Sequence, residues 1–286
     1  MKALFTLSDF QAPASAEDLG CTFIAYSVLI IMAQSTLSAT FGYFRHSLPY
    51  CDKEKHRKIF ARQFTALGVF LLLSHDGIVG SLNNPAGHVV PSGTVEYGVQ
   101  RVYSYSPYAS RLGSIHLAWQ VQNFFVALKF GDGIEHMIHH VVTASLAYFS
   151  FQPYLHIYSP FFFGVTEISS IFLTVVCFFV NDRHSRMYIE GIENDLPGLR
   201  VVAGGLFVVL FFLTRIVIWP YISYYFWRDN LALLRSKKGN DVHSYAAVYT
   251  FMAANCLLTF LQFFWFKDIL KNALLTLQGK NDKKRD

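Results

Sequence analysis

Charged residues are scarce in this sequence. Of its 286 residues only 15% are charged, whereas 53% are hydrophobic and 17% are aromatic. A soluble domain carries roughly a quarter of charged residues, so this composition excludes an ordinary soluble globular protein. The net charge of +5 comes from Lys and Arg in the connections between apolar runs, where they form no basic stripe alternating with exposed aromatics. We therefore expect no nucleic-acid partner.

Cysteine is also scarce, and its spacing excludes two kinds of scaffold. Cys21, Cys51, Cys177 and Cys256 show no CxxC or zinc-type spacing. Two or three of them lie in apolar runs, where cysteine is commonly a small hydrophobic residue. We expect neither a disulfide framework nor a structural metal. The chain also lacks an Asn-x-Ser/Thr acceptor, so glycosylation gives no indication of sidedness.

Long apolar runs are abundant. Several reach the roughly 20 residues that a hydrocarbon core of about 30 Å requires. We predict an all-α polytopic membrane bundle of about seven transmembrane helices. They are placed at about 20–42, 59–82, 114–130, 134–151, 154–180, 199–227 and 244–270. The glycines on either side of Asp132 are a turn signal, so the third and fourth spans are expected to form a helical hairpin.

Basic residues indicate an orientation. Acidic residues precede the first span, and six Lys or Arg residues follow it between Arg45 and Arg62. The positive-inside rule then places the N-terminus in the lumen and, after seven crossings, the C-terminus in the cytosol. Lys283 and Lys284 resemble a cytosolic dilysine retrieval signal of the endoplasmic reticulum, although a basic tail without this role is the alternative. The loop that begins near Arg228 has the opposite charge bias. Either this loop is tolerated because the early charges dominate, or the sixth or seventh span does not cross as drawn.

Three histidines near the start of the fourth span are the main reactive candidates. His136, His139 and His140 share one helical face with Thr143. An imidazole can act as general base or nucleophile toward an acyl group while its neighbour is held in a defined tautomer by a carboxylate or amide. Packing histidines are the structural alternative. A metal site would need more ligands, because no second HxxHH segment occurs and the nearest carboxylate candidate is remote, so no metal is expected.

Two charged residues lie deep in the predicted spans. At 1.5 Å per residue, Glu167 is roughly 20 Å and Arg215 roughly 22 Å from the cytosolic helix ends. An isolated charge near mid-bilayer costs about 2.5 to 3.5 kcal/mol, so we expect these residues to pair with each other or with the histidine face. The structural interpretation is an ion pair between two helices. The functional one is that Glu167 orients or deprotonates a histidine, or that Arg215 holds an anionic headgroup or a thioester-linked moiety.

The order of these residues resembles that of the TLC-domain family, the membrane proteins related to ceramide synthases. His139-His140 and Thr143 are followed by Glu167-Ile-Ser-Ser-Ile-Phe172. This is similar to the family's histidine pair and its downstream E-[IL]-S-x-x-F motif. Further similar segments are Arg215-Ile-Val-Ile-Trp-Pro220 and Phe264-Trp-Phe-Lys267, so the resemblance covers about 60–270.

Two departures bear on the branch of the family. Where ceramide synthases carry paired aspartates after the histidines, this chain has Glu167 and Ser170. In the preceding helix, Trp119-Gln-Val-Gln-Asn123 places Asn123 where the family has an acid. The chain is therefore nearer to the branch outside the ceramide synthases. The resemblance implies a six-helix TLC core plus an N-terminal helix around a lipid-accepting cavity in the endoplasmic-reticulum membrane.

The resemblance also suggests a division of the chain. We assign 1–19 to a lumenal N-terminal segment, 20–58 to an anchor helix and basic cytosolic loop, 59–271 to a TLC-like membrane domain, and 272–286 to a cytosolic basic tail. Membrane lipids are the expected partners, and a homodimer is the oligomeric state considered. No bound cofactor is expected, and acyl-CoA is the co-substrate considered.

Three functions remain open. In the first, a ceramide-synthase-like acyl transfer to a lipid amine or alcohol uses the catalytic candidates His139, His140 and Glu167. The residues expected to bind substrate are Arg215, Thr143, Asn123, His136 and Ser170. In the second, the same cavity binds or moves lipid and maintains membrane composition without chemistry. The third is a fatty-acid elongase, which the absence of Lys-x-x-Glu-x-x-Asp and His-x-x-Met-Tyr segments disfavours.

Overall fold

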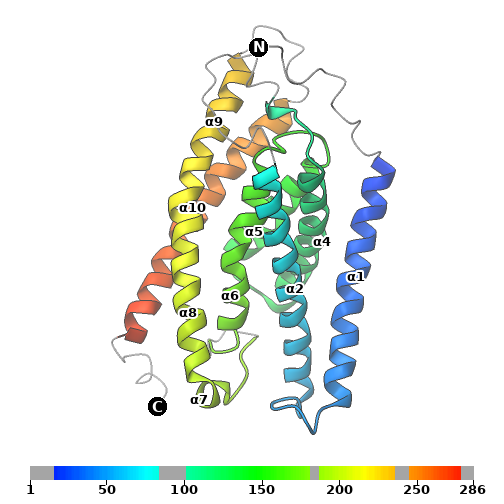
Figure 1. Ribbon diagram of the computed structural model, residues 1–286, viewed down its shortest axis with the longest axis vertical. Coiled ribbons are helices and arrows are strands. Elements are labelled where there is room, and N and C mark those ends of the chain that lie inside the picture. Colours follow the sequence, from blue (N-terminus) through cyan, green and yellow to red (C-terminus); the bar gives the residue numbers. More distant parts are fainter. Residues whose placement is uncertain (1–15, 84–100, 181–186, 236–244, 278–286) are drawn as a thin grey trace. The chain divides into compact units, whose positions relative to one another are not determined.

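The regular structure is helical throughout the part of the chain that the structure describes. The computed structural model (Figure 1) describes residues 16–83, 101–180, 187–235 and 245–277. Its α-helices are α1 Ala16–Tyr43, α2 Glu54–Asn83, α4 Pro107–Phe130, α5 Ile134–Phe149, α6 Ile168–Val176, α7 Ile192–Asp195, α8 Pro197–Phe211, α9 Trp219–Arg235 and α10 Tyr245–Leu277. Two π-helical segments, η2 Pro160–Gly164 and η4 Phe212–Ile218, and the 3₁₀ turn η3 Val165–Glu167 complete the list. The all-α prediction is confirmed.

Four of these helical stretches are long and apolar enough to cross a membrane. They are Gly20–Tyr43, Glu54–Asn83, Pro197–Arg235 and Tyr245–Thr276, and a shorter apolar stretch covers Pro160–Val176. The multi-pass character of the protein is therefore supported, whereas the count of seven spans stays a prediction. The sixth predicted span is longer than 199–227, because α8, η4 and α9 follow one another without a break.

The chain divides into two compact units, each assembled from separate stretches. The first contains the chain up to Ser27, His75–Val165 and Tyr221–Cys256. The second contains Val28–Ser74, Thr166–Pro220 and the chain from Leu257. The histidines belong to the first unit, and the deep Glu and Arg belong to the second.

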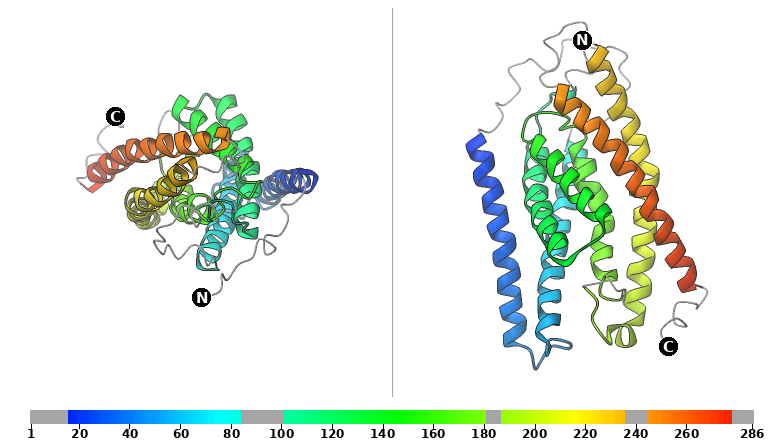
Figure 2. Two further views of the ribbon diagram at one scale, coloured as in Figure 1. Left: turned by 90° about the horizontal axis from the view of Figure 1, so that it is seen from above. Right: turned by 180° about the vertical axis from the view of Figure 1, so that it is seen from behind.

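The predicted helical hairpin is present in the first unit, where α4 and α5 pack against each other (Figure 2). Helix α4 ends at Phe130, and Gly131 takes a left-handed φ of 69° that glycine adopts without strain. The helix begins earlier than the predicted residue 114. Ser106 caps its N-terminus by accepting from the Ala109 N–H at 3.4 Å, and Pro107 occupies the first turn.

The start of the fifth predicted span, at 154, is wrong. Residues after α5 are irregular, and helical structure begins only at Pro160. Leu155 has a φ of 58°, and its N–H donates to the Val102 carbonyl at 2.6 Å. His156 is fully buried, with Nδ1 accepting from the Ser106 N–H at 3.1 Å and Nε2 lying 2.6 Å from the Ser150 carbonyl. These contacts satisfy the segment's polar groups and stabilise a buried, non-helical conformation.

In the second unit, α6 packs on α8, and the turn between α1 and α2 contacts the segment around α7. Ile59 of α2 packs with Phe179, Ile189 and Ile192 in a small apolar core. The Tyr50 hydroxyl donates to Asp195, and Lys53 forms a 2.9 Å ion pair with Glu190. These contacts hold the end of α2 that carries most of the basic residues.

Several sequence predictions concern segments outside the described residues. They are the N-terminal segment up to residue 15, the part of the basic loop from 236 to 244, and the tail from 278 onward with Lys283 and Lys284. The proposed retrieval signal and the orientation of the termini therefore stay predictions.

Candidate functional site

His140 faces α4, where the structure brings it to two residues that sequence reasoning missed. Its Nδ1 lies 2.6 Å from Gln120 Oε1, and Gln120 Nε2 lies 3.1 Å from His116 Nε2. Gln120 and His116 are buried, at 5% and 1% exposure. The His116 ring also packs on that of Phe163, with centroids 5.0 Å apart. A polar chain of three side chains therefore connects α5 with the interior face of α4.

The Gln120 amide fixes the tautomers of both imidazoles. Its oxygen can only accept, so Nδ1 of His140 donates to it, and in the neutral imidazole Nε2 carries the lone pair. Its nitrogen can only donate, so Nε2 of His116 accepts and Nδ1 of His116 carries the proton. His140 is thereby oriented with its basic nitrogen at Nε2, which general-base or nucleophilic chemistry requires.

The other residues of the histidine face have different surroundings. The His139 ring lies edge-on to that of His140, with centroids 5.5 Å apart. Thr143 is buried, and its hydroxyl donates to the His139 carbonyl at 2.5 Å. His136 is at the exposed start of the helix, with a side chain 54% exposed and Nδ1 at 3.2 Å from Glu135 Oε1. The predicted cluster of three histidines is thus a pair plus a separate, surface histidine.

Asn123, expected to bind substrate, is buried on α4 and donates from Nδ2 to the Trp119 carbonyl at 2.8 Å. The accepting carbonyl lies one turn back on the same helix, and the bond uses one of the two protons of the Asn123 amide. Among the described residues, no three His, Cys, Asp or Glu side chains are grouped so that they could hold a metal ion.

In the second unit, Glu167 and Arg215 form the ion pair expected from their similar depth. Arg215 Nη2 lies 3.4 Å from Glu167 Oε1, and the two residues are only 7% and 8% exposed. Arg215 also donates to Ser169 at 3.1 Å, to Ser170 at 3.2 Å and to Gln262 at 3.5 Å. Four of its five N–H groups therefore point at protein acceptors, which favours a structural role over the holding of an anionic headgroup. The predicted support of a histidine by Glu167 stays a prediction.

Both partners of this ion pair belong to distorted helical turns. Glu167 ends the 3₁₀ turn η3, and Arg215 lies inside the π-helical segment η4. In that segment Thr214 donates to the Leu210 carbonyl at 2.7 Å, and the Arg215 guanidinium lies 5.5 Å from the centre of the Phe211 ring. Single π turns inside α-helices occur frequently at functional sites.

A second buried ion pair, in the first unit, was also missed from the sequence. Arg101 Nη2 lies 3.1 Å from Asp229 Oδ2, and the Tyr158 hydroxyl donates to the same oxygen at 2.5 Å. All three residues are less exposed than 5%. Asp229 is visible in the sequence as an acidic residue beside Arg228 near the end of a predicted span. No sequence pattern, however, connects this aspartate with Arg101.

Comparison with known proteins gives one clear result. A family model described as the TLC domain matches residues 20–271. The chain belongs to the TLC-domain family. Among curated proteins and among solved structures, no match was found.

The TLC domain so defined contains every candidate residue of both units. It begins at residue 20 and therefore includes most of α1, whereas the TLC-like segment predicted from the sequence begins at 59; the end at 271 is the same. Membership in the TLC family, together with four helices able to cross a membrane, makes this a multi-pass membrane protein related to lipids.

Proposed function

We propose that this TLC-domain protein transfers an acyl group from an acyl-CoA to a lipid amine or alcohol in the endoplasmic-reticulum membrane, with His140 as general base. The observation that carries the proposal is the 2.6 Å contact between His140 Nδ1 and Gln120 Oε1. It assigns the lone pair to Nε2 and restrains the ring, which are the two requirements for proton abstraction by an imidazole.

In the proposed reaction, His140 Nε2 takes the proton of the amine or hydroxyl group while that group attacks the thioester carbonyl. The tetrahedral intermediate then expels the thiolate of coenzyme A, and the imidazolium returns the proton to the sulfur. The products are an amide or ester and coenzyme A, and no further reactant is consumed. Gln120 and His116 are positioning residues in this scheme, because they act through the orientation of His140.

The test uses the purified full-length chain in lipid nanodiscs, incubated with acyl-CoA and a panel of lipid amines and alcohols, with products detected by mass spectrometry. His140→Ala should lower the rate by about 10²- to 10⁴-fold, the usual contribution of a general base. His136→Ala is the matched control, because that histidine is exposed on the same helix, and its rate should stay within about twofold of the wild type. Full activity in a folded His140→Ala protein would exclude the proposed role.

Lipid binding or transport without chemistry is the second candidate. It is supported by the polar groups on this face, which form hydrogen bonds within the protein. Thr143 donates to a carbonyl of its own helix, and Gln120 contacts two histidines. The two candidates differ in cells. Loss of one lipid class in both His139→Ala and His140→Ala supports acyl transfer, whereas an unchanged lipid profile in both supports the second candidate.

The proposed location can be tested separately. Exchange of Lys283 and Lys284 for Ser should move the protein from the endoplasmic reticulum to later compartments, as judged by fluorescence microscopy of the tagged chain. An unchanged distribution would contradict the retrieval signal.

A further inference from the structure

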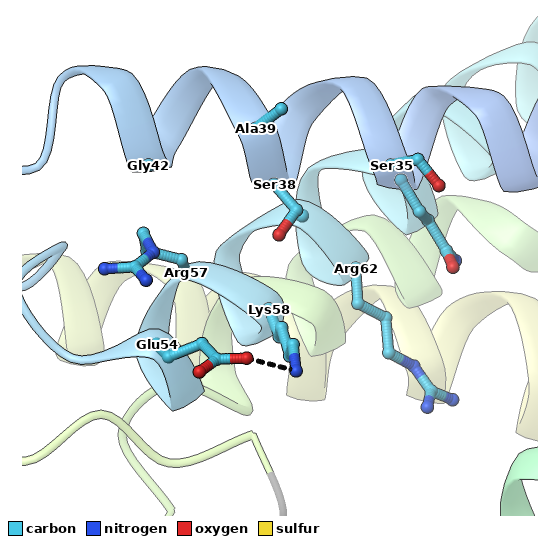
Figure 3. Close-up of a pocket in the computed structure, with 10 residues that line it drawn as sticks. Ser35, Ser38, Ala39, Gly42, Glu54, Arg57, Lys58 and Arg62 are labelled. Atoms are coloured by element: carbon cyan, nitrogen blue, oxygen red, sulfur yellow. Dashed lines mark ion pairs between the residues drawn. The ribbon is translucent and has the colours of Figure 1, made fainter.

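A polar cleft lies between α1 and α2 in the second unit, and no residue of the candidate site lines it (Figure 3). Its volume is about 550 Å³, within the range of about 300 to 1,000 Å³ that is usual for ligand sites. The α1 wall includes Ser35, Ser38 and Gly42, and the α2 wall includes Arg57, Lys58 and Arg62. Small polar side chains therefore face long cationic ones.

The cleft has an excess of positive charge. Three cationic side chains line it together with a single carboxylate, that of Glu54. Glu54 pairs with Lys58 at 2.5 Å, so this carboxylate is engaged by the lysine, whereas the contacts of Arg57 are with backbone carbonyl groups. Because α2 begins at Glu54, the amide groups of its first turn add a positive partial charge at the same end.

Arg57 is held in place by the turn that precedes α2. Its Nη1 donates to the Cys51 carbonyl at 3.2 Å and to the Asp52 carbonyl at 3.1 Å. These bonds use one terminal nitrogen and orient the guanidinium, while Nε and Nη2 remain on its other edge. A bidentate contact with an oxyanion needs two N–H groups on one edge of the guanidinium.

The opposite wall permits a close approach to this arginine. A Cβ atom placed on Gly42 would lie 3.8 Å from Arg57 Nε, so the glycine leaves space beside the guanidinium. In Figure 3, Ser38 points from α1 toward α2. Its hydroxyl, like that of Ser35, can donate to an anionic oxygen.

We infer that this cleft binds a phosphate group, carried either by a lipid headgroup or by a soluble phosphorylated molecule. Arginine, lysine and hydroxyl donors are the groups that bind phosphate oxygens, and arginine does so with bidentate geometry. The cleft lies at the end of the apolar stretch Gly20–Tyr43, which is the level at which lipid headgroups meet a spanning helix. The inference does not depend on acyl transfer at His140.

Attraction of the whole basic segment to anionic lipids is the rival explanation. Each Lys or Arg near an anionic surface adds to that attraction wherever it lies. Lys55 separates the two explanations, because it is exposed and does not line the cleft. Lys55→Gln and Arg57→Gln each remove one positive charge, but only Arg57 lines the cleft.

The experiment uses the full chain in phosphatidylcholine nanodiscs. One arm adds phosphatidate as a minor lipid and counts the molecules retained by native mass spectrometry, and the other titrates coenzyme A and inorganic phosphate by thermophoresis. Arg57→Gln should weaken binding by about tenfold or more, the effect of losing one charged hydrogen bond. Ser38→Leu, which fills the cleft without changing charge, should also weaken it, whereas Lys55→Gln should change it less than about twofold.

Binding of phosphatidate alone identifies a lipid headgroup, and binding of coenzyme A or inorganic phosphate identifies a soluble source. Either result supports the inference when Ser38→Leu weakens that binding. If Arg57→Gln and Lys55→Gln weaken binding equally and Ser38→Leu binds as the wild type does, general attraction to the basic segment explains the binding and the inference is overturned. A wild-type protein that binds none of the probes would overturn it as well. Arg57→Gln removes hydrogen bonds to the turn before α2 and could unfold the protein, whereas Ser38 makes no contact with that turn. Ser38→Leu therefore still tests the inference if Arg57→Gln does not fold.

Discussion

Exchange of Glu167 for Gln should strongly destabilise the protein, because it leaves the Arg215 guanidinium buried without its counter-charge. The charged groups are 3.4 Å apart, and the residues are 8% and 7% exposed, so solvent screens neither of them much. Removal of one partner from a buried ion pair costs about 3 to 5 kcal/mol. The other acceptors of Arg215 are neutral, so they cannot replace the carboxylate, and we expect a loss of about 3 kcal/mol.

A double variant separates the charge from the rest of the side chain. Glu167→Gln combined with Arg215→Met removes both charges, so it should cost less than the sum of the two single changes, by about 1 to 3 kcal/mol. Ser170→Ala is the matched control. It removes one neutral acceptor of the same guanidinium, and a loss of about 1 to 2 kcal/mol is expected.

The free energies come from reversible unfolding in mixed micelles with increasing sodium dodecyl sulfate, followed by circular dichroism. The wild type and the four variants are measured under one set of conditions, because the ion pair is expected to weaken wherever detergent admits water. A loss below about 1 kcal/mol in Glu167→Gln, with additive effects in the double variant, would refute the view that this pair stabilises the helices of the second unit.

Three further predictions concern other parts of the chain. Gly77→Ala should cost about 1 to 3 kcal/mol in the same unfolding assay, because its Cβ would lie 2.5 Å from backbone of η2, whereas Gly68→Ala on the same helix meets nothing within 4 Å and should not destabilise. Asp229→Asn should cost about 3 to 5 kcal/mol because a buried arginine loses its partner, and the exposed Asp268→Asn should cost almost nothing; similar losses in both would contradict this. The hydrogen bond to Asp195 raises the pKa of Tyr50 to about 12, so the protonated phenol is the favoured form, and its stabilisation is complete below about pH 10 and is lost as the pH rises toward 12. The ionisation difference spectrum between the wild type and Tyr50→Phe should therefore have its midpoint near 12, and a midpoint near 10 would disprove it.

Helices and their turns were predictable wherever a local signal was strong. The turn at Gly131 follows from the glycines beside Asp132, and the long apolar runs of α1, α2 and α10 exceed the length that a membrane requires. The segment after α5 was not predictable in this way. Its apolar residues, such as Leu155, are buried in an irregular conformation, and periodicity alone does not distinguish that from a buried helix.

The site was predictable only in part, because its contacts join residues far apart in the chain. The pairing of Glu167 with Arg215 followed from depth, since a bilayer makes isolated charges costly. His116 and Gln120 were visible as two polar residues one turn apart on an apolar helix, but their link to His140 depends on how α4 packs against α5. A single sequence contains no information on that packing at the level of atoms.

The π-helical segment η4 also changes which residues of its helix share a face. Phe211 and Trp219 are both buried, at 5% and 4% exposure, yet a spacing of eight residues in a regular α-helix would separate them by about 80°. The extra residue of a π turn brings them back to within about 20°, so both contact the interior. Deletion of a single residue from Phe212–Ile218 would therefore restore a regular α-helix in which Phe211 and Trp219 are seven residues apart, still within about 20° of each other, so Trp219 would keep its contact with Thr259, to which it now donates at 2.8 Å. A chain one residue shorter here would keep this face of the helix and lose the widened turn around Arg215.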